Sequence, residues 1–385
     1  MARKGSFTTK GKTLPNKTAI RRVFFVGSTS HQVQTLGAAM NYFAGCLHGT
    51  HEGGLVISTP AFPGGELTDS HWVDEQLHRL DGISAFRRVK KATFGETENY
   101  FGLPLYVPRR GQVADVKEIN LLFEDRVRAI YPEFQTTAKN LKLGQPRLQV
   151  GINVVDLLIF GTWWWAPGQL DAFIERTRME VEAILKFTNG NVFFVIESPT
   201  FKILSNLTRC RPGILKWYLD AFARIVRTFQ GAPWGFHFCD GRLGGDALGD
   251  QGVTKKLSLY DRIHHHKYTV KASNFLLHGL EKEELVPDLV HYPFVAGSRR
   301  PSLDRDDYEV YRNLYVPEKT QVFAGAISNQ LGLEEQGEFY HILDGVLGRP
   351  GKPHVGSANS CGYGSDDLQG MLSSFDRIRY VSLVA

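Results

Sequence analysis

The sequence predicts an α/β protein built as a (β/α)8 barrel, and two observations support this prediction. Short apolar runs of strand length alternate with longer segments of helical apolar spacing, and this strand-then-helix order occurs eight times. The polar residues that interrupt the apolar runs stand at or just after their ends, where barrel enzymes hold their catalytic groups. With 385 residues, of which 42% are hydrophobic, the chain is long enough to bury one large core.

Eight apolar runs are the predicted strands, with helices around them. The strands are expected over residues 22–28, 55–59, 147–153, 191–197, 234–239, 288–294, 321–328 and 354–360. The helices are expected over residues 31–47, 70–80, 115–130, 171–187, 213–229, 254–280, 306–314, 334–347 and 368–375. Three consecutive histidines, 264–266, fall in one of these helices and are expected on a solvated face, because neighbouring helical side chains point about 100° apart.

Two segments depart from the alternation. Residues 1–20 carry several basic side chains and no apolar stretch, and are expected to form a flexible basic arm. Residues 84–112 read as two strands joined by a turn, which predicts a hairpin inserted over one barrel mouth. The predicted organisation is therefore an arm, 1–20, and a single barrel domain, 21–385, whose insertion of hairpin plus helix covers 84–146.

Composition excludes several functional classes. Lysine plus arginine number 45 and aspartate plus glutamate 40, without a basic stripe interleaved with aromatic residues, so no nucleic-acid partner is expected. No segment has the length and apolarity of a membrane span or a signal peptide, so no membrane partner is expected either. The four cysteines then indicate reduced thiols and a cytoplasmic location. A homo-oligomer is compatible with the sequence.

Two cysteines and one histidine form a candidate metal site. His237 and Cys239 are two residues apart at the end of a predicted strand, so their side chains point the same way. Cys361 follows the last predicted strand in a glycine-rich turn. Two thiols and an imidazole are preferred zinc ligands, and three protein ligands leave one position for a substrate. The alternative is that these residues are an ordinary buried cysteine and a hydrogen-bonded core histidine.

Five short motifs in the same order resemble the catalytic domain of cobalamin-independent methionine synthase. Related zinc-dependent alkyl transferases, including epoxyalkane:coenzyme M transferases, share the pattern. The segments are Phe25–Ser28, Gly65–Glu66 with Asp69 and Trp72, Val195–Pro199, His237–Cys239, and the turn at Cys361. Together they cover residues 21–385.

The resemblance implies a transferase that binds Zn²⁺ and activates a small thiol for methyl or alkyl transfer. His237, Cys239 and Cys361 would be the metal ligands. The expected partners are a small-molecule thiol and an alkyl donor. For substrate binding, the candidates are Gly27 and Ser28, which would bind a carboxylate, and Glu66 and Glu197, which would bind an ammonium group. Trp163 is the candidate for the pocket wall. Glu197 and Asp240 are the candidates for catalysis. Trp163 is alternatively a packing residue between the barrel and its helices.

Two departures from the family pattern narrow this expectation. Pro293 stands where methionine synthases have a glutamate ligand, and His291 on the same face is the candidate substitute. Residues 326–329 contain no histidine where the family has its general acid, so folate is not the expected methyl donor. Because Glu66 and Glu197 would repel a sulfonate, the thiol is expected to be amino-acid-like rather than coenzyme M.

Three alternatives stay open. One is an epoxide-opening thiol transferase with another thiol. The second is a metal-free decarboxylase or lyase like uroporphyrinogen decarboxylase, for which Arg242 beside the proposed ligands is the one supporting feature. The third is an inactive barrel that serves as a binding partner.

Overall fold

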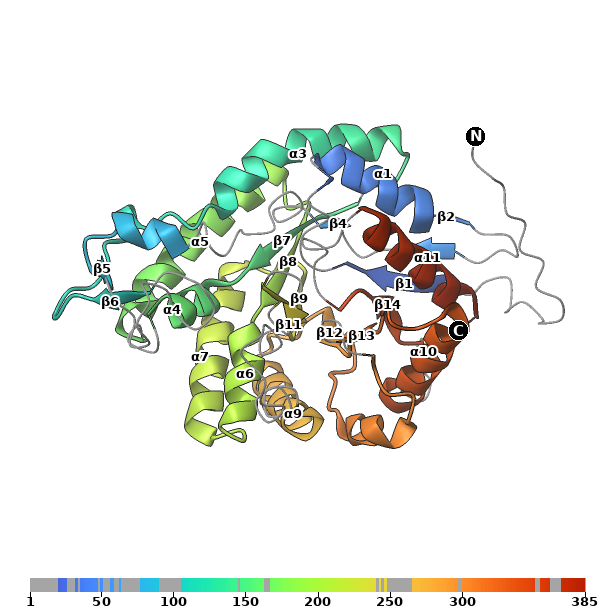
Figure 1. Ribbon diagram of the computed structural model, residues 1–385. Coiled ribbons are helices and arrows are strands. Elements are labelled where there is room, and N and C mark those ends of the chain that lie inside the picture. The colour runs from blue at the N-terminus through green and yellow to red at the C-terminus, as the bar shows by residue number, and fades with distance from the viewer. Residues whose placement is uncertain are drawn as a thin grey trace.

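A curled parallel sheet forms the centre of the computed structural model (Figure 1). The structure describes residues 20–25, 32–33, 35–47, 49–50, 56–58, 62–63, 77–89, 105–144, 146–162, 167–239, 242–243, 246–247, 265–295, 300–349, 354–360 and 368–384. Seven parallel strands follow one another in the order β1 (Ile20–Phe24), β14 (Gly356–Ala358), β13 (Gln321–Gly325), β12 (Leu289–Pro293), β9 (Trp234–His237), β8 (Val192–Glu197) and β7 (Leu148–Ile152). Each falls within a predicted strand or overlaps one, and the α/β class is confirmed.

Short strands stand at the two edges of this sheet. β3 (Val56–Ser58) pairs parallel with β1, and β4 (Phe62–Pro63) pairs parallel with β7. β2 (Gly49–Thr50) pairs antiparallel with β3. Residues 59–61, which join β3 to β4, lie outside the described residues, so closure into an eight-stranded barrel stays a prediction.

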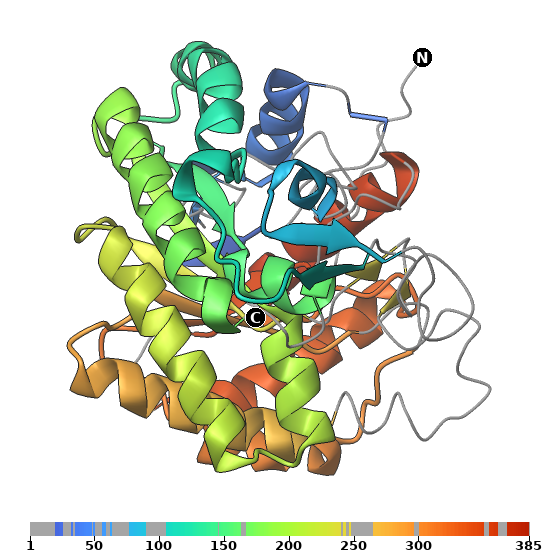
Figure 2. The same ribbon diagram turned by 90° about the vertical axis from the view of Figure 1, so that its left-hand side faces the viewer.

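Helices cover the outer face of the sheet, and Figure 2 shows the green and yellow ones side by side. They are α1 (Leu36–Leu47), α3 (Phe123–Asn140), α4 (Val154–Thr162), α5 (Leu170–Thr188), α6 (Pro199–Leu207), α7 (Pro212–Thr228), α9 (His266–Lys282), α10 (Leu333–Leu347) and α11 (Leu368–Val384). Short 3-10 helices are η1 (Arg79–Gly82), η2 (Val116–Glu118), η3 (Pro167–Gln169) and η4 (Arg305–Asn313). Each helix that the structure describes is too short or too polar to cross a lipid bilayer.

The helix predicted over 115–130 begins later and ends later in the structure. Only η2 forms near its predicted start, and α3 runs from Phe123 to Asn140 through Pro132. The start is fixed by the buried Glu180 of α5, whose carboxylate accepts hydrogen bonds from the backbone N–H groups of Leu121 and Phe123, both at 2.9 Å. A carboxylate at a helix amino terminus also complements the helix dipole.

Other helix predictions need smaller corrections. α9 begins at His266, because His265 has extended dihedrals; residues 251–264 lie outside the described residues. His266 is half-buried rather than solvated, with Nδ1 3.1 Å from the Tyr311 hydroxyl. The predicted helix 306–314 is the 3-10 helix η4. α4 and α6 were not predicted, because their apolar residues continue the runs of β7 and β8 without a clear helical period.

The segment predicted as an inserted hairpin contains a small separate sheet. β5 (Phe86–Arg88) pairs antiparallel with β6 (Tyr106–Pro108). The residues between them, 90–104, and the predicted basic arm, 1–19, lie outside the described residues. Placement of the hairpin over a barrel mouth, and the division into arm, barrel and insertion, stay predictions.

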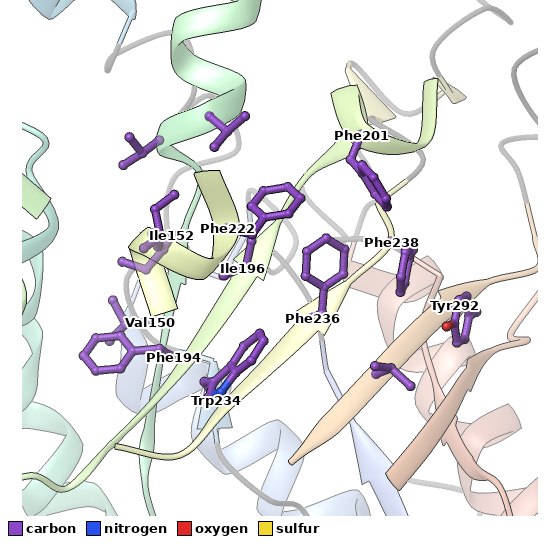
Figure 3. Close-up of a cluster of buried hydrophobic side chains, with 14 of the residues drawn as sticks. Val150, Ile152, Phe194, Ile196, Phe201, Phe222, Trp234, Phe236, Phe238 and Tyr292 are labelled. Atoms are coloured by element: carbon purple, nitrogen blue, oxygen red, sulfur yellow. The ribbon is translucent and has the colours of Figure 1, made fainter. Parts of the chain in front are cut away.

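The two faces of the sheet carry different apolar clusters, because successive strand side chains alternate between faces. One cluster consists of Phe24, Phe193, Val195, Leu289, Phe323 and Ala358. The opposite face packs against the helices, as Figure 3 shows with Val150, Ile152, Phe194, Ile196, Phe201, Phe222, Trp234, Phe236, Phe238 and Tyr292. We call the first set the inner cluster.

Glycines make room for the bulky members of the inner cluster. A Cβ atom on Gly356 would lie 2.3 Å from the ring of Phe323, and one on Gly235 would lie 2.6 Å from Leu289 Cδ1. Interior packing is too dense to absorb such contacts without displacement. These two glycines therefore keep the neighbouring strands paired around the inner cluster.

Replacing Gly356 with alanine is expected to lower the free energy of unfolding by about 1 to 3 kcal/mol, the usual effect of overpacking a core. The measurement is urea unfolding followed by circular dichroism. Gly213→Ala is the matched control, since a Cβ at this exposed position of α7 meets nothing within 4 Å. A stability unchanged by Gly356→Ala would contradict the packing described for Phe323.

Candidate functional site

Three ionisable side chains stand in a row at the carboxyl ends of neighbouring strands. Glu197 of β8 pairs with His237 of β9, and His237 pairs with His291 of β12. All three are buried, with 7%, 1% and 0% of their surface exposed. Val195 and Leu289 lie two residues before Glu197 and His291, so the row occupies the same face as the inner cluster. It forms a polar layer on that apolar cluster.

The two histidines are in direct contact. Their Nδ1 atoms are 2.5 Å apart and their ring centroids are 4.5 Å apart. One Nδ1 must carry a proton and the other accept it, because two protons or two lone pairs at this distance would repel. Nε2 of His237 is buried and has no hydrogen-bond partner among the described residues. Of the two ring nitrogens of His237, Nδ1 is therefore hydrogen-bonded to His291, and Nε2 could bind a further group.

Gly325 of β13 provides the space for His291. A Cβ atom at this position would lie 2.7 Å from His291 Nε2, 2.8 Å from Ser360 Cα and 3.0 Å from Pro293 Cα. Two of these three atoms belong to the backbone and cannot move independently. A residue with a side chain at position 325 would displace the imidazole.

Cys239 completes the set of described donors. It follows β9, is 6% exposed, and its backbone N–H donates to the His237 carbonyl at 2.8 Å. Imidazole nitrogen and thiolate sulfur are the donor types that zinc prefers, so the residues present fit the metal in kind. Within the described part of the chain, no three His, Cys, Asp or Glu side chains form a group placed to hold a metal ion.

The other described cysteine provides a contrast. Cys210 is also buried, and its Sγ donates to the Tyr268 carbonyl at 3.2 Å. Burial raises the pKa of the Cys210 thiol to about 11. It stays protonated at neutral pH and acts as a packing residue.

The structure describes four of the ten candidate site residues. Glu197, His237 and His291 lie on neighbouring strands in register, and Cys239 follows His237 closely in the chain. The other six lie outside the described residues: Gly27, Ser28, Glu66, Trp163, Asp240 and Cys361. Their roles stay predictions.

The two segments that narrowed the expectation, at Pro293 and at residues 326–329, lie within the described residues. Pro293 ends β12 and pairs with Gly325. After β13 the chain turns through buried residues: the backbone N–H of Ser328 donates to Gln336 Oε1 at 2.9 Å, and Gln336 Nε2 donates to the Ala326 carbonyl at 2.9 Å. Residues 326–329 thus form a hydrogen-bonded turn without a titratable side chain.

Asn153 is a site residue that the sequence analysis missed. It follows β7, whose last residue Ile152 pairs with Ile196, so it lies level with Glu197 on the next strand. It is 3% exposed, and neither its amide oxygen nor its amide nitrogen has a hydrogen-bond partner in the described part of the chain. An asparagine before a helix usually accepts from the first turn. Its position directly after an apolar run was the signal available.

Asp156 was also missed, because it lies in the unpredicted helix α4. Its Oδ1 accepts from the backbone N–H of Thr200 at 2.7 Å, in the first turn of α6, which begins directly after Glu197 and Ser198. Burial raises the pKa of Asp156 from 3.8 to about 7, against the opposing effect of hydrogen bonds from Thr200 and Ser198. Asp156 therefore anchors the segment that carries Glu197.

Comparison with known proteins supports the fold. No family model and no curated protein matches the sequence. Among solved structures, a B12-independent methionine synthase from Shewanella sp. W3-18-1, in complex with selenomethionine, matches with a TM-score of 0.52 and 11% identity over 94% of this chain and 96% of that chain. A putative vitamin-B12 independent methionine synthase from Listeria monocytogenes covers 93% and 94%, at 11% identity and a TM-score of 0.44. The first match confirms the methionine synthase-like fold that the motifs predicted.

The raised pKa of Asp156 predicts a pH-dependent stability. In the folded state Asp156 keeps a proton that the unfolded state releases above about pH 4. The stability that this proton contributes is therefore fully present below about pH 4 and is lost as the pH rises through 7. Relative to Asp156→Asn, wild type should lose about 3 kcal/mol of unfolding free energy between about pH 4.5 and about pH 8. Urea unfolding of both proteins at the two pH values measures this. Parallel pH profiles would contradict the raised pKa.

Proposed function

We propose that this chain is a zinc-dependent transferase that activates a small, amino-acid-like thiol for methyl or alkyl transfer. The observation that supports this most directly is the buried Nε2 of His237, which lacks a hydrogen-bond partner among the described residues and stands two residues before Cys239. A buried polar atom left unsatisfied costs about 1 to 3 kcal/mol. A metal ion at this atom would remove that cost.

The histidine pair suggests how the ligands are divided. His237 would bind zinc through Nε2, while Nδ1 of His291 fixes the ring and tautomer of His237. Metal-bound histidines commonly have their other ring nitrogen held in this way. If both Nδ1 atoms were ligands, tetrahedral geometry with bonds of about 2.0 to 2.1 Å would place them about 3.3 Å apart. The 2.5 Å separation favours His291 as the support rather than as the replacement for the missing glutamate ligand.

Cys239 and Cys361 would supply the two sulfur ligands. Zinc, when bound, lowers the pKa of a coordinated substrate thiol so that it is a thiolate at neutral pH. The protein residues position that substrate and exclude water. The inner cluster below His291, with the rings of Phe24 and Phe323 5.5 Å apart, closes the site on the side of the sheet interior.

Polar groups around the proposed zinc would recognise an amino acid. Glu197 at the end of β8 carries the charge that an ammonium group requires, and the Asn153 amide can donate to a carboxylate or accept from an ammonium group. Gly27, Ser28, Glu66 and Trp163 would complete the pocket, and Asp240 would assist catalysis. The Shewanella protein was solved with selenomethionine, an amino acid with an alkylated selenium, which supports this substrate class.

The alkyl donor is proposed to be a molecule other than folate. Transfer from a poor leaving group requires a general acid, and the turn at residues 326–329 offers only backbone, hydroxyl and amide groups. A donor with a better leaving group, or an epoxide whose strain favours opening, needs less assistance. Both are compatible with a thiolate nucleophile.

One observation favours a different reaction class. Nδ1 of His237 and Nδ1 of His291 already satisfy each other without a metal, as in a proton-sharing pair. A metal-free decarboxylase or lyase with this pair as general acid and base is therefore the second candidate. Arg242 in β10 (Arg242–Leu243), which pairs with β11 (Asp246–Ala247), would then bind an acidic substrate.

Metal content separates these candidates. Wild-type protein produced with zinc and dialysed should retain about one zinc per chain, the stoichiometry of a single catalytic site. Cys239→Ser should lower zinc affinity at least about tenfold, and His291→Asn about 10- to 100-fold, the range for a residue that orients a ligand. Plasma mass spectrometry of dialysed protein and a chelator competition titration measure both.

Cys210→Ser is the matched control, because this cysteine is also buried and its Sγ donates to the Tyr268 carbonyl. It should retain the wild-type zinc content. Wild-type protein without zinc would support the metal-free candidate instead, and a Cys239→Ser variant that binds zinc as wild type does would show that Cys239 is not a ligand.

The choice of thiol can be tested by thermal unfolding of zinc-loaded protein. L-homocysteine and L-cysteine should raise the melting temperature more than 3-mercaptopropionate or 2-mercaptoethanesulfonate, which lack the ammonium group. A ligand at 100 times its Kd stabilises the folded state by about 2.7 kcal/mol. Glu197→Gln should remove the preference for amino-acid thiols. Equal protection by the sulfonate thiol would show that the amino-acid assignment is wrong.

A further inference from the structure

A cavity lies at the opposite end of the sheet from the histidine pair. It has a volume of about 270 Å³ and is lined by residues that precede or begin β13 and β14, together with Arg22 of β1. Because these strands are parallel, their first residues share the edge away from Glu197 and His291. Phe323 and Gly356 form part of its inner wall. The cavity is therefore separate from the proposed catalytic site.

The lining of this cavity is positively charged. Arg22, Lys319 and Arg349 contribute three cations, against one carboxylate, Glu318. Arg22 and Arg349 are half-buried and Lys319 is exposed. None of the three cations forms an ion pair with a residue that the structure describes. His354, also in the lining, is paired with Asp344, Nδ1 to Oδ2 at 2.7 Å.

Arg349 presents an unused hydrogen-bonding edge. Its Nη1 donates to the carbonyls of Val316 and Pro317, at 3.0 and 3.2 Å, and its Nη2 donates to the carbonyl of Thr320 at 2.7 Å. These bonds use three of the five N–H groups of a guanidinium. The N–H of Nε has no hydrogen-bond partner among the described residues, and Nε and Nη2 form one side of the planar group. Such an edge binds a carboxylate or phosphate through two parallel hydrogen bonds.

The environment favours an anion in this place. Burial lowers the pKa of Arg349, and its three acceptors are neutral carbonyls. A half-buried cation without a counter-charge is unfavourable, whereas an anion on its free edge would form a charge-assisted pair. The carbonyl bonds meanwhile fix the guanidinium in place, so little conformational entropy is lost on binding.

We propose that this cavity binds a small oxyanion, the phosphate or carboxylate group of a small molecule, with Arg349 as the bidentate donor and with Arg22 and Lys319 completing the site. The volume suits such a group, being below the roughly 300 to 1,000 Å³ typical of pockets for larger ligands. The excess of positive charge would also attract the anion from solution.

Calorimetric titration of the full-length protein tests the proposal. Inorganic phosphate and succinate are titrated separately at constant ionic strength, with sodium chloride as the reference, so that the two arms distinguish a phosphate from a carboxylate ligand. At least one should show saturable binding with one site per chain. Lys319→Gln should weaken it about tenfold, the loss of one charge-assisted hydrogen bond.

Two further variants keep the result interpretable. Arg349→Lys retains the charge but not the bidentate edge, and should weaken binding about tenfold or more. Lys186→Gln, at an exposed lysine of α5 outside the cavity, should bind as wild type does. No saturable binding of either anion, or equal affinities of the Lys319 and Lys186 variants, would overturn the proposal.

Discussion

The parallel register of β8, β9 and β12 is the constraint on which the candidate site depends. It places Glu197, His237 and His291 at one height, and strand alternation turns all three to the face that carries the inner cluster. A shift of β12 by one residue would replace His291 with Val290 or Tyr292, which now pack among the helices. The aromatic packing on the helical side in Figure 3 therefore maintains the geometry of the polar side.

Space inside the sheet is the second constraint. Phe323 can occupy the interior only because Gly356 faces it, and His291 only because Gly325 does. The same apolar layer that closes the site excludes water from the histidine pair. Electrostatic interactions are stronger in such surroundings, and an unsatisfied polar atom is more costly. The buried Nε2 of His237, which has no hydrogen-bond partner among the described residues, therefore costs free energy. A bound metal or substrate would remove that cost.

The sequence predicted the strands well, because each apolar run is long enough to identify a buried strand on its own. It also predicted from alternation that His237 and Cys239 point the same way, which stays a prediction, whereas the structure does show His237 beside His291. It could not predict that α3 begins at Phe123, since the cap is Glu180, a residue 57 positions away. Nor could it predict the contact of the two imidazoles, the unsatisfied amide of Asn153 or the three carbonyls that hold Arg349, because each depends on groups brought together only by folding.

Phe323 lies between the cavity at the amino end of the sheet and the histidine pair at the carboxyl end. Phe323 lines the cavity at the amino end, contacts Phe24 at a ring distance of 5.5 Å, and pairs in register with His291, whose ring is 5.8 Å from Phe24. An anion could influence the histidine pair only by stabilising a different position of these rings, since coupling requires two states with different affinities. The close approach of Gly356 leaves Phe323 little room to move. Tight packing of the inner cluster therefore argues against coupling between the two proposed sites.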